Sequence, residues 1–310
     1  MEIVLQLLLL AVGFLMLVKG ADWFVDGAAG IAEKFGIPHL VVGLTIVAMG
    51  TSAPEAAVSI TAALKGNAGI TIGNIVGSNI LNVLVILGIA SVIVPIKVAK
   101  STVKIEIPYM LVITFLLLAL GCTGNEIVRW EGVVLWAAFI LYLSYLFWMA
   151  KKDKADVEEE TVDQPIWKLL LMIVVGLVLI MLGSDFAVDA ATELARIFGM
   201  SERFIGLTIV ALGTSLPELV TSVAAACKGK ADIAIGNIVG SNVFNILFVV
   251  GTTALITPVV FESKFIIDMV ISAAAGILLW LCVVKDHKLS RAGGIVMLVS
   301  YAAYFVYLIS

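Results

Sequence analysis

The chain repeats one long segment of its own sequence. The stretch that begins at Leu44, LTIVAMGTSAPEAAVSITAALKGNAGITIGNIVGSNILNVLVILG, returns from Leu207 as LTIVALGTSLPELVTSVAAACKGKADIAIGNIVGSNVFNILFVVG. The two copies align without a gap, and 28 of the 45 positions are identical. The same alignment pairs GADWFVDGA at 20–28 with GSDFAVDAA at 183–191. The chain is therefore a duplication, and its fold must build two halves from one pattern.

Long apolar segments place both halves in a membrane. Hydrophobic residues make up 62% of the chain, only 14% of residues are charged, and the mean hydropathy is +1.14. Apolar stretches of about 18 residues or more with few charges are typical of membrane-spanning helices. We expect ten of them, at 3–33, 40–64, 69–94, 104–122, 131–150, 166–197, 203–227, 231–256, 265–284 and 292–309.

An odd number of spans in each half decides their relative orientation. Five spans precede the charged stretch at 151–165 and five follow it, so the second half must enter the membrane upside down. Inverted repeats are typical of secondary transporters, which bind their substrate near the midplane. The sequence predicts an all-α polytopic membrane protein with ten transmembrane helices in two inverted repeats, 1–150 and 166–310, joined by a linker at 151–165.

The distribution of Lys and Arg orients the chain. With the N-terminus outside, the inner loops and ends hold 13 basic residues and the outer ones hold 5, with Lys19 inside a span. Cytoplasmic loops carry the excess of basic residues. We therefore expect a multi-pass protein of the cell membrane with both termini outside and the linker in the cytoplasm. The net charge of −4 argues against a nucleic-acid partner, and no required protein partner is evident beyond the lipid bilayer.

The motif GTSAPE at 50–55, repeated as GTSLPE at 213–218, puts polar groups inside apolar spans. Pro54 cannot donate to the Gly50 carbonyl and crowds that turn, so the carbonyls of Gly50 and Thr51 are expected to leave the helix ladder. Free carbonyls within a membrane are tolerated only where they line a cavity or meet other protein. Carbonyls, hydroxyls and a carboxylate suit hard cations such as Ca²⁺ and Na⁺. A simple kink is the alternative, but two intramembrane glutamates at equivalent positions of the repeat favour a functional site.

A second motif, GNIVGSNILN at 73–82, returns as GNIVGSNVFN at 236–245. It places polar side chains four residues apart on one helical face, namely Asn74, Ser78 and Asn82 in the first copy and Asn237, Ser241 and Asn245 in the second. Its glycine pairs also allow close helix packing, so a purely structural role is the alternative. Asn79 and Asn242 point elsewhere, and we interpret them as structural.

Four aspartates form a third repeated set, Asp22 and Asp26 in one half and Asp185 and Asp189 in the other. They could guide ions toward the site. The favoured interpretation is that they are interfacial charges, satisfied by Lys19, Arg196 or helix ends.

With G-T-S-x-P-E and G-N-x-x-G-S-N both present twice, the whole chain resembles the cation/calcium antiporter superfamily. The resemblance implies a prokaryotic Na⁺/Ca²⁺ exchanger whose site is a diamond of the spans at 40–64, 69–94, 203–227 and 231–256, with the spans at 3–33 and 166–197 sliding across it. It implies Ca²⁺ between the two glutamates, backbone carbonyls from the two threonines, and flanking Na⁺ sites that use the two alanine carbonyls. The implied ligands are Glu55, Glu218, Thr51, Thr214, Ser52, Ser215, Ser78, Ser241, Asn82, Asn245, Ala48 and Ala211.

One position departs from the family pattern. Some members carry an aspartate where this chain has Asn245, so the expected site charge here is −2, from the two glutamates. One Ca²⁺ or two Na⁺ match that charge, and a third Na⁺ would make exchange electrogenic. A Ca²⁺/H⁺ antiporter and a K⁺-dependent Na⁺/Ca²⁺ antiporter stay open as alternatives, and an intramembrane enzyme and a cation channel are less favoured. The chain is expected to be no enzyme and to need no cofactor, Ca²⁺ and Na⁺ being its transported ions.

Overall fold

The first half of the chain folds into helices that cross the molecule and break near its centre. The structure, a computed structural model, describes residues 2–152, 164–200, 205, 208–209 and 211–309. π-Helical segments, labelled η, interrupt several of the helices. The elements are α1 (Glu2–Phe35), α2 (His39–Val42), η1 (Gly43–Val47), α3 (Ala48–Thr51), α4 (Ala53–Leu64), α5 (Gly69–Leu81), η2 (Asn82–Ile86), α6 (Leu87–Ile93), β1 (Ile96–Lys97), η3 (Thr102–Glu106), α7 (Ile107–Cys122), β2 (Glu126–Ile127) and α8 (Arg129–Lys152).

The second half follows the same order of elements where it is described. Its elements are α9 (Ile166–Ile197), α11 (Ala211–Gly213), α12 (Leu216–Cys227), α13 (Ala231–Phe244), η6 (Asn245–Val250), α14 (Gly251–Ile256), β3 (Val259–Val260), α15 (Lys264–Val283), β4 (Lys288–Leu289) and α16 (Arg291–Ile309). The linker expected at 151–165 falls mostly outside the described residues.

The described helices include eight that are long and apolar enough to cross a membrane, or nine if the bent pair His39–Thr51 and Ala53–Leu64 is counted as one span. The segment expected at 203–227 is described only in part, and within it Leu216–Cys227 is a shorter apolar helix. The chain is therefore mostly helical and multi-spanning, as the sequence predicts. The expectation of an all-α fold misses four two-residue strands, in which β1 pairs with β4 and β2 with β3, each antiparallel.

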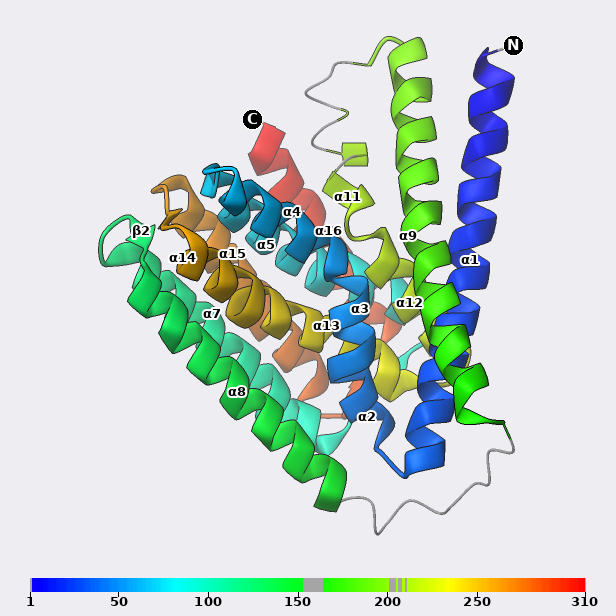
Figure 1. Cartoon of the computed structure of the whole chain (residues 1–310), viewed down its shortest axis with the longest axis horizontal. Coiled ribbons are helices and arrows are strands. Elements are labelled where there is room, and N and C mark those ends of the chain that lie inside the picture. Colours follow the sequence, from blue (N-terminus) through cyan, green and yellow to red (C-terminus); the bar gives the residue numbers. More distant parts are fainter. Residues whose placement is uncertain (1, 153–163, 201–204, 206–207, 210, 310) are drawn as a thin grey trace.

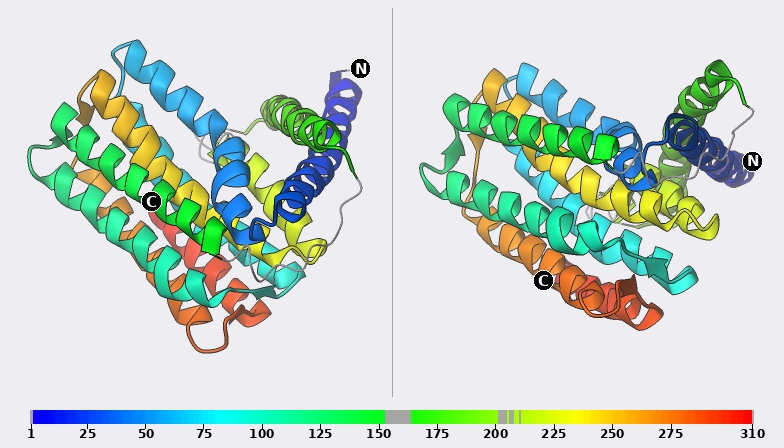
Figure 2. Two further views of the ribbon diagram at one scale, coloured as in Figure 1. Left: turned by 60° about the horizontal axis from the view of Figure 1, so that its bottom comes forward. Right: turned by 90° about the horizontal axis from the view of Figure 1, so that it is seen from below.

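The two helices that carry the GNIVGSN motif lie at the centre of the molecule. In the most apolar 18-residue window of each span, 94% of residues are buried in Ala231–Ile256 and 78% in Gly69–Ile93, against 17% in Ile3–Phe35. Helices α1 and α9 instead lie side by side and antiparallel at one edge of the bundle (Figures 1 and 2). Polar motif residues are thus shielded from lipid, and the outer helices present apolar side chains such as Leu5, Leu8 and Val174.

Glycines allow α1 and α9 to approach closely. A Cβ atom at Gly20 would lie 2.7 Å from the Gly176 carbonyl oxygen, and one at Gly176 would lie 2.6 Å from the Phe24 amide nitrogen. Gly13 and Gly183 make an equivalent contact, with a Cβ at Gly183 placed 2.8 Å from the Gly13 carbonyl oxygen. Small residues are what membrane helices use to bring their backbones together. At these points the backbones of α1 and α9 are therefore too close for a larger residue to replace the glycine.

We expect Gly20→Ala to destabilise the protein, because a methyl group there meets backbone atoms that cannot rotate away. Overpacking of this kind costs about 1–3 kcal/mol. Thermal unfolding in detergent should show a lower midpoint for Gly20→Ala than for Gly69→Ala, where an added Cβ meets nothing within 4 Å. Equal midpoints for the two variants would show that α1 and α9 are not in close contact.

Candidate cation-binding site

Two broken helices bring a pair of glutamates to the centre of the protein. The first helix breaks at Ser52 with a bend of 49°, and Glu55 lies in the first turn of α4. The equivalent break precedes α12, whose first turn holds Glu218. Both carboxylates are buried, at 1% and 0% exposure. Each sits at a helix N-terminus, where the helix dipole favours negative charge.

Each glutamate uses one carboxylate oxygen and leaves the other without a partner. The Ser52 hydroxyl donates to Oε1 of Glu218 over 2.8 Å, and the Ser78 hydroxyl lies 3.4 Å from Oε1 of Glu55. Oε2 of both glutamates is buried and accepts no hydrogen bond. An unpartnered buried carboxylate oxygen is costly, so these two atoms are suited to a cation.

Two asparagines add a matching pair of free oxygens. Nδ2 of Asn82 donates to the Asn242 side chain over 3.0 Å, and Nδ2 of Asn245 donates to the Asn79 side chain over 3.1 Å. The Oδ1 atoms of Asn82 and Asn245 are buried without a partner. Because the amide nitrogens are held away by their donor bonds, the oxygens are left for another ligand. Asn82 begins η2 and Asn245 begins η6, and π-helical turns occur frequently at functional sites.

Asn79 and Asn242 hold this arrangement together. Nδ2 of Asn79 lies 3.4 Å from the Asn242 carbonyl, and Nδ2 of Asn242 donates to the Asn79 carbonyl over 3.2 Å. The prediction of a structural role agrees with these contacts. It missed that the same two side chains orient Asn82 and Asn245, because these contacts join residues 160 and 166 positions apart and leave no local signal in the sequence.

Asn74 and Asn237 contact the backbone of the helix turns that carry the two glutamates. Each lies near the carbonyl of its glutamate, and each donates to a buried hydroxyl, Ser59 over 3.0 Å or Ser222 over 2.9 Å. These amide nitrogens tie the first turns of α4 and α12 to the helices that carry the second motif.

The two copies of the G-T-S-x-P-E motif are engaged differently. In the first copy both hydroxyls are bonded: Thr51 donates to Oδ1 of Asn237 over 3.0 Å, and Ser52 donates to Glu218. The Ala48 carbonyl, just before this copy, accepts from Ser52 N–H over 3.0 Å and lies 3.4 Å from the Ser241 hydroxyl. In the second copy, the Ser215 hydroxyl is buried without a partner and Thr214 lines a cavity. The structure thus links the first copy to the second half through Thr51–Asn237, Ser52–Glu218 and Ala48–Ser241. Thr214 lines the cavity, and Ala211 begins α11.

The backbone at the break differs from the expectation in one respect. The Gly50 carbonyl was expected to be free, but it accepts a backbone N–H at the end of α3. The helix tightens over its last turn and so recaptures this carbonyl, as frequently happens at helix ends. The ladder resumes where Ala56 N–H donates to the Ser52 carbonyl over 3.1 Å.

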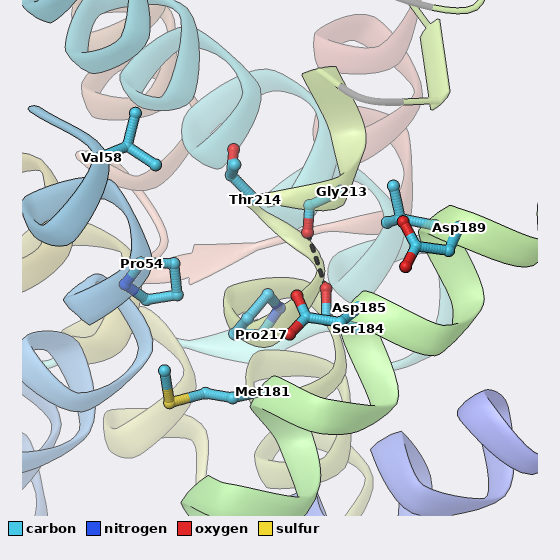
Figure 3. Close-up of a pocket in the computed structure, with 10 residues that line it drawn as sticks. Pro54, Val58, Met181, Ser184, Asp185, Asp189, Gly213, Thr214 and Pro217 are labelled. Atoms are coloured by element: carbon cyan, nitrogen blue, oxygen red, sulfur yellow. Dashed lines mark hydrogen bonds between the residues drawn. The ribbon is translucent and has the colours of Figure 1, made fainter. Parts of the chain in front are cut away.

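A cavity of about 220 Å³ lies beside the site on one face of the protein. It separates α9 from α4, with Asp185 and Asp189 on one wall, Pro54 and Val58 on the other, and Thr214 between them (Figure 3). The Ser184 hydroxyl donates to the Gly213 carbonyl over 2.8 Å and ties α9 to α11. The described residues therefore give access to the second motif copy from this side.

The repeated aspartates do not have the partners that we expected. Asp22 and Asp26 pair with Lys228, which lies 3.1 Å from one carboxylate and 2.8 Å from the other. Neither Lys19 nor Arg196 is this partner; Arg196 forms an ion pair with Glu193 on its own helix. The sequence could not indicate Lys228, because it lies 202 residues beyond Asp26.

The charge of the site is small for its number of ligands. Among the described residues, no three His, Cys, Asp or Glu side chains gather where they could hold a metal ion. The remaining candidates are hydroxyl, amide and carbonyl oxygens, which are neutral ligands for hard cations.

The family model described as sodium/calcium exchanger protein matches this chain twice, over residues 5–148 and 168–310. The chain belongs to the sodium/calcium exchanger family. CaxA of Alkalimonas amylolytica is 38% identical over 304 residues, covering 94% of this chain and 95% of CaxA. The sodium/calcium exchanger MaX1 of Methanosarcina acetivorans is 32% identical, with 99% of each chain covered.

Solved structures of family members agree with the fold. The sodium–calcium exchanger NCX_Mj, soaked with zero Na⁺ and Ca²⁺, matches with a TM-score of 0.84 at 32% identity, covering 99% of each chain. A second NCX_Mj structure, soaked with 10 mM Na⁺ and zero Ca²⁺, matches with a TM-score of 0.83 over 98% of this chain. The resemblance seen in the two motifs thus extends to sequence and fold over the whole chain.

Pro54→Ala and Pro217→Ala are expected to weaken Ca²⁺ binding more than stability. Both prolines lie in the first turn of their helices, where alanine is well tolerated. The new N–H can bond to the carbonyl four residues earlier, straighten the break and move the following glutamate. Loss of such support typically lowers metal affinity by about 10–100-fold. Calcium titration by calorimetry measures this effect, with thermal unfolding as the control. Normal calcium affinity in both variants would show that the prolines only shape the helices.

Proposed function

We propose that the protein is a secondary-active antiporter that exchanges Na⁺ for Ca²⁺, binding Ca²⁺ between Glu55 and Glu218. The observation that carries the proposal is the set of four buried, unpartnered oxygens, Oε2 of both glutamates and Oδ1 of Asn82 and Asn245. Buried acceptors without a partner are uncommon in folded proteins, and these four belong to two pairs of residues at equivalent positions of the repeat. A hard cation is the ligand that satisfies all of them.

The proposed ligand set follows the two repeats. The two carboxylates supply a charge of −2, which either one Ca²⁺ or two Na⁺ neutralise. Because a buried site of low dielectric tolerates little net charge, it can hold either one Ca²⁺ or two Na⁺. The full set comprises Glu55, Glu218, Thr51, Thr214, Ser52, Ser215, Ser78, Ser241, Asn82 and Asn245, with the carbonyls of Ala48 and Ala211 at flanking Na⁺ positions.

We also propose ten transmembrane helices in two inverted repeats, 1–150 and 166–310, with the linker at 151–165 in the cytoplasm and both termini outside. Three observations support it. Repeat-related helices α1 and α9 run antiparallel (Figure 1). Asn79 and Asn242 bond reciprocally. The strand pairs exchange partners between the halves, β1 with β4 and β2 with β3.

Exchange by alternating access is supported by the difference between the two sides of the site. The cavity lies between α9 and α4, whereas the repeat-related helices α1 and α12 pack together and are joined by Lys228. In this interpretation the structure is the state open toward the face where α1 begins and α9 ends, and the opposite state closes this cavity.

The test is uptake of radioactive calcium into proteoliposomes loaded with Na⁺, at clamped membrane potential and with a protonophore present. Uptake that requires an outward Na⁺ gradient and no K⁺ is the expected result. In a parallel assay without the protonophore and without Na⁺, uptake driven by a proton gradient would favour a Ca²⁺/H⁺ antiporter. A need for internal K⁺ in the first assay would favour K⁺-dependent exchange. Calcium flux that persists without any counter-ion would overturn the proposal in favour of a channel.

A further inference from the structure

Lys228 joins two helices at the closed side of the site. It stands directly after α12 and reaches α1, where its Nζ lies 3.1 Å from Oδ1 of Asp22, 2.8 Å from Oδ1 of Asp26 and 3.0 Å from the Asp22 carbonyl. The lysine side chain is 27% exposed, so the pair is partly shielded from water. All three contacts bridge the helix pair that is in contact, α1 and α12.

The sequence contains a second copy of these charges at equivalent positions of the repeat. Asp185 and Asp189 are the counterparts of Asp22 and Asp26, and Lys65 is the counterpart of Lys228. In the described part of the chain this second set forms no ion pair. Asp185 and Asp189 line the cavity, while Lys65 lies at the exposed end of α4 on the cavity's other side.

We propose that the two sets form alternating locks, in which Lys228 holds Asp22 and Asp26 while the cavity is open and Lys65 holds Asp185 and Asp189 when it closes. The proposal rests on the proposed alternating access. The same three residue types occur at equivalent positions of the two repeats. The contact of Lys228 with Asp22 and Asp26 therefore shows the geometry that Lys65 could adopt with Asp185 and Asp189. Closing the cavity moves α9 toward α4, as α1 now lies against α12.

The locks also change the charge that faces an entering cation. While the cavity is open, Asp185 and Asp189 have no cationic partner among the described residues and present two negative charges beside Thr214. Negative charge along an entrance raises the local concentration of cations. Once Lys65 pairs with them, that attraction ends, and the same carboxylates hold the closed state.

The two locks are not equal. On the α1 side, Lys230 forms a further ion pair with Glu33, and His39 lies 3.3 Å from the same carboxylate. The positions equivalent to Lys230 and Glu33 in the other half are Asn67 and Arg196, which cannot form that pair. The structure's preference for the cavity-open state is consistent with this additional contact.

The test uses one reporter and two lysine variants with opposite expected effects. Cys122, Cys227 and Cys282, which are free thiols, are replaced by serine, and Val58, a 44% exposed residue of the cavity wall, is replaced by cysteine. A membrane-impermeant maleimide is then applied to proteoliposomes in the absence of Na⁺ and Ca²⁺. The rate of labelling reports how often the cavity is open.

Lys228→Gln should lower the labelling rate by about two- to tenfold, the range expected for loss of partly exposed ion pairs. Lys65→Gln should raise it, and adding Lys65→Gln to Lys228→Gln should bring the rate back toward that of the reporter alone. Lys264→Gln removes a lysine whose partner, Glu262, lies two residues away, and should leave the rate unchanged. Equal or same-direction effects of the two lysine variants would overturn the proposal.

Charge exchange separates a lock from a general loss of stability. Lys65→Asp combined with Asp189→Lys should restore the labelling rate that Lys65→Asp alone changes, because the pair is rebuilt with its signs reversed. Failure of this rescue in a folded double variant would also overturn the proposal. The labelling rate does not depend on which ions are exchanged. If the two lysine variants shift it in opposite directions but the protein shows no Na⁺-driven calcium uptake, the proposal of two locks stands and the proposed function is rejected.

Discussion

Proteoliposomes that contain Glu55→Gln or Glu218→Gln are expected to show no Na⁺-driven Ca²⁺ uptake above that of protein-free vesicles. Glutamine keeps the shape of the side chain. Its oxygen can still accept the hydrogen bond from Ser78 at position 55 or from Ser52 at position 218. It removes one of the two charges in a buried site, so Ca²⁺ would carry an unmatched positive charge there. Breaking a buried charge pair costs about 3–5 kcal/mol, which corresponds to about 10²–10⁴ in affinity.

Glu106→Gln is the matched control for this experiment. Glu106 is a third membrane-buried glutamate, at 0% exposure, and it also has one unpartnered oxygen. It lies at the end of η3 and is bonded to Tyr145, away from the four free oxygens. We expect it to retain uptake. Wild-type uptake by either folded site variant, or loss of uptake in all three, would contradict the assignment of Glu55 and Glu218.

The second large effect is expected from Asn242→Ala and Asn79→Ala. Each substitution removes an amide that accepts from a site asparagine and donates to the opposite helix. The site asparagine loses its fixed orientation and can turn its nitrogen toward the cation. Removing such a supporting partner typically lowers metal affinity by about 10–100-fold.

Calorimetric titration with Ca²⁺ and with Na⁺ measures this effect, and Asn67→Ala, at an exposed loop position, is the control. The two variants should lose similar affinity, because their contacts are reciprocal. Unchanged affinity in both, with a lowered unfolding midpoint, would show that Asn79 and Asn242 only hold the helices together.

The sequence predicts much of this architecture because long apolar stretches define the spans and repeated polar motifs mark the exceptional positions inside them. The GNIVGSN motif lies on the two candidate spans with the largest buried shares, and its equivalent residues Asn79 and Asn242 contact each other. The glycine contacts between α1 and α9 were also present in the sequence, since Gly13 and Gly20 have counterparts at Gly176 and Gly183. They are less visible because glycine is common throughout the chain.

What the sequence could not predict is the difference between two nearly identical halves. The pattern around Ser52 and the pattern around Ser215 are the same, yet one hydroxyl bonds to Glu218 and the other has no partner. Because the two halves have nearly the same motifs, the sequence allows either the α1–α12 side or the α9–α4 side to be the closed one. Which side is closed depends on the conformational state and not on the sequence. The partner of Asp22 was missed for the same reason, because Lys228 and Lys65 are equivalent in sequence and only one of them is in contact.

The four short strands have a mechanical consequence. They join loops of the first half to loops of the second, extended by Val98 N–H to the His287 carbonyl and Phe261 N–H to the Asn125 carbonyl. These strand pairs connect the two halves through loops between the other helices, and α1 and α9 take no part in them. The proposed movement of α1 and α9 past the other helices would therefore act on the turns that follow these two helices. Gly36 and Gly199, at equivalent positions of the two repeats, lie in these turns with φ of 63° and 76°. Glycine changes its backbone dihedrals at little cost, so both turns can accommodate such a movement.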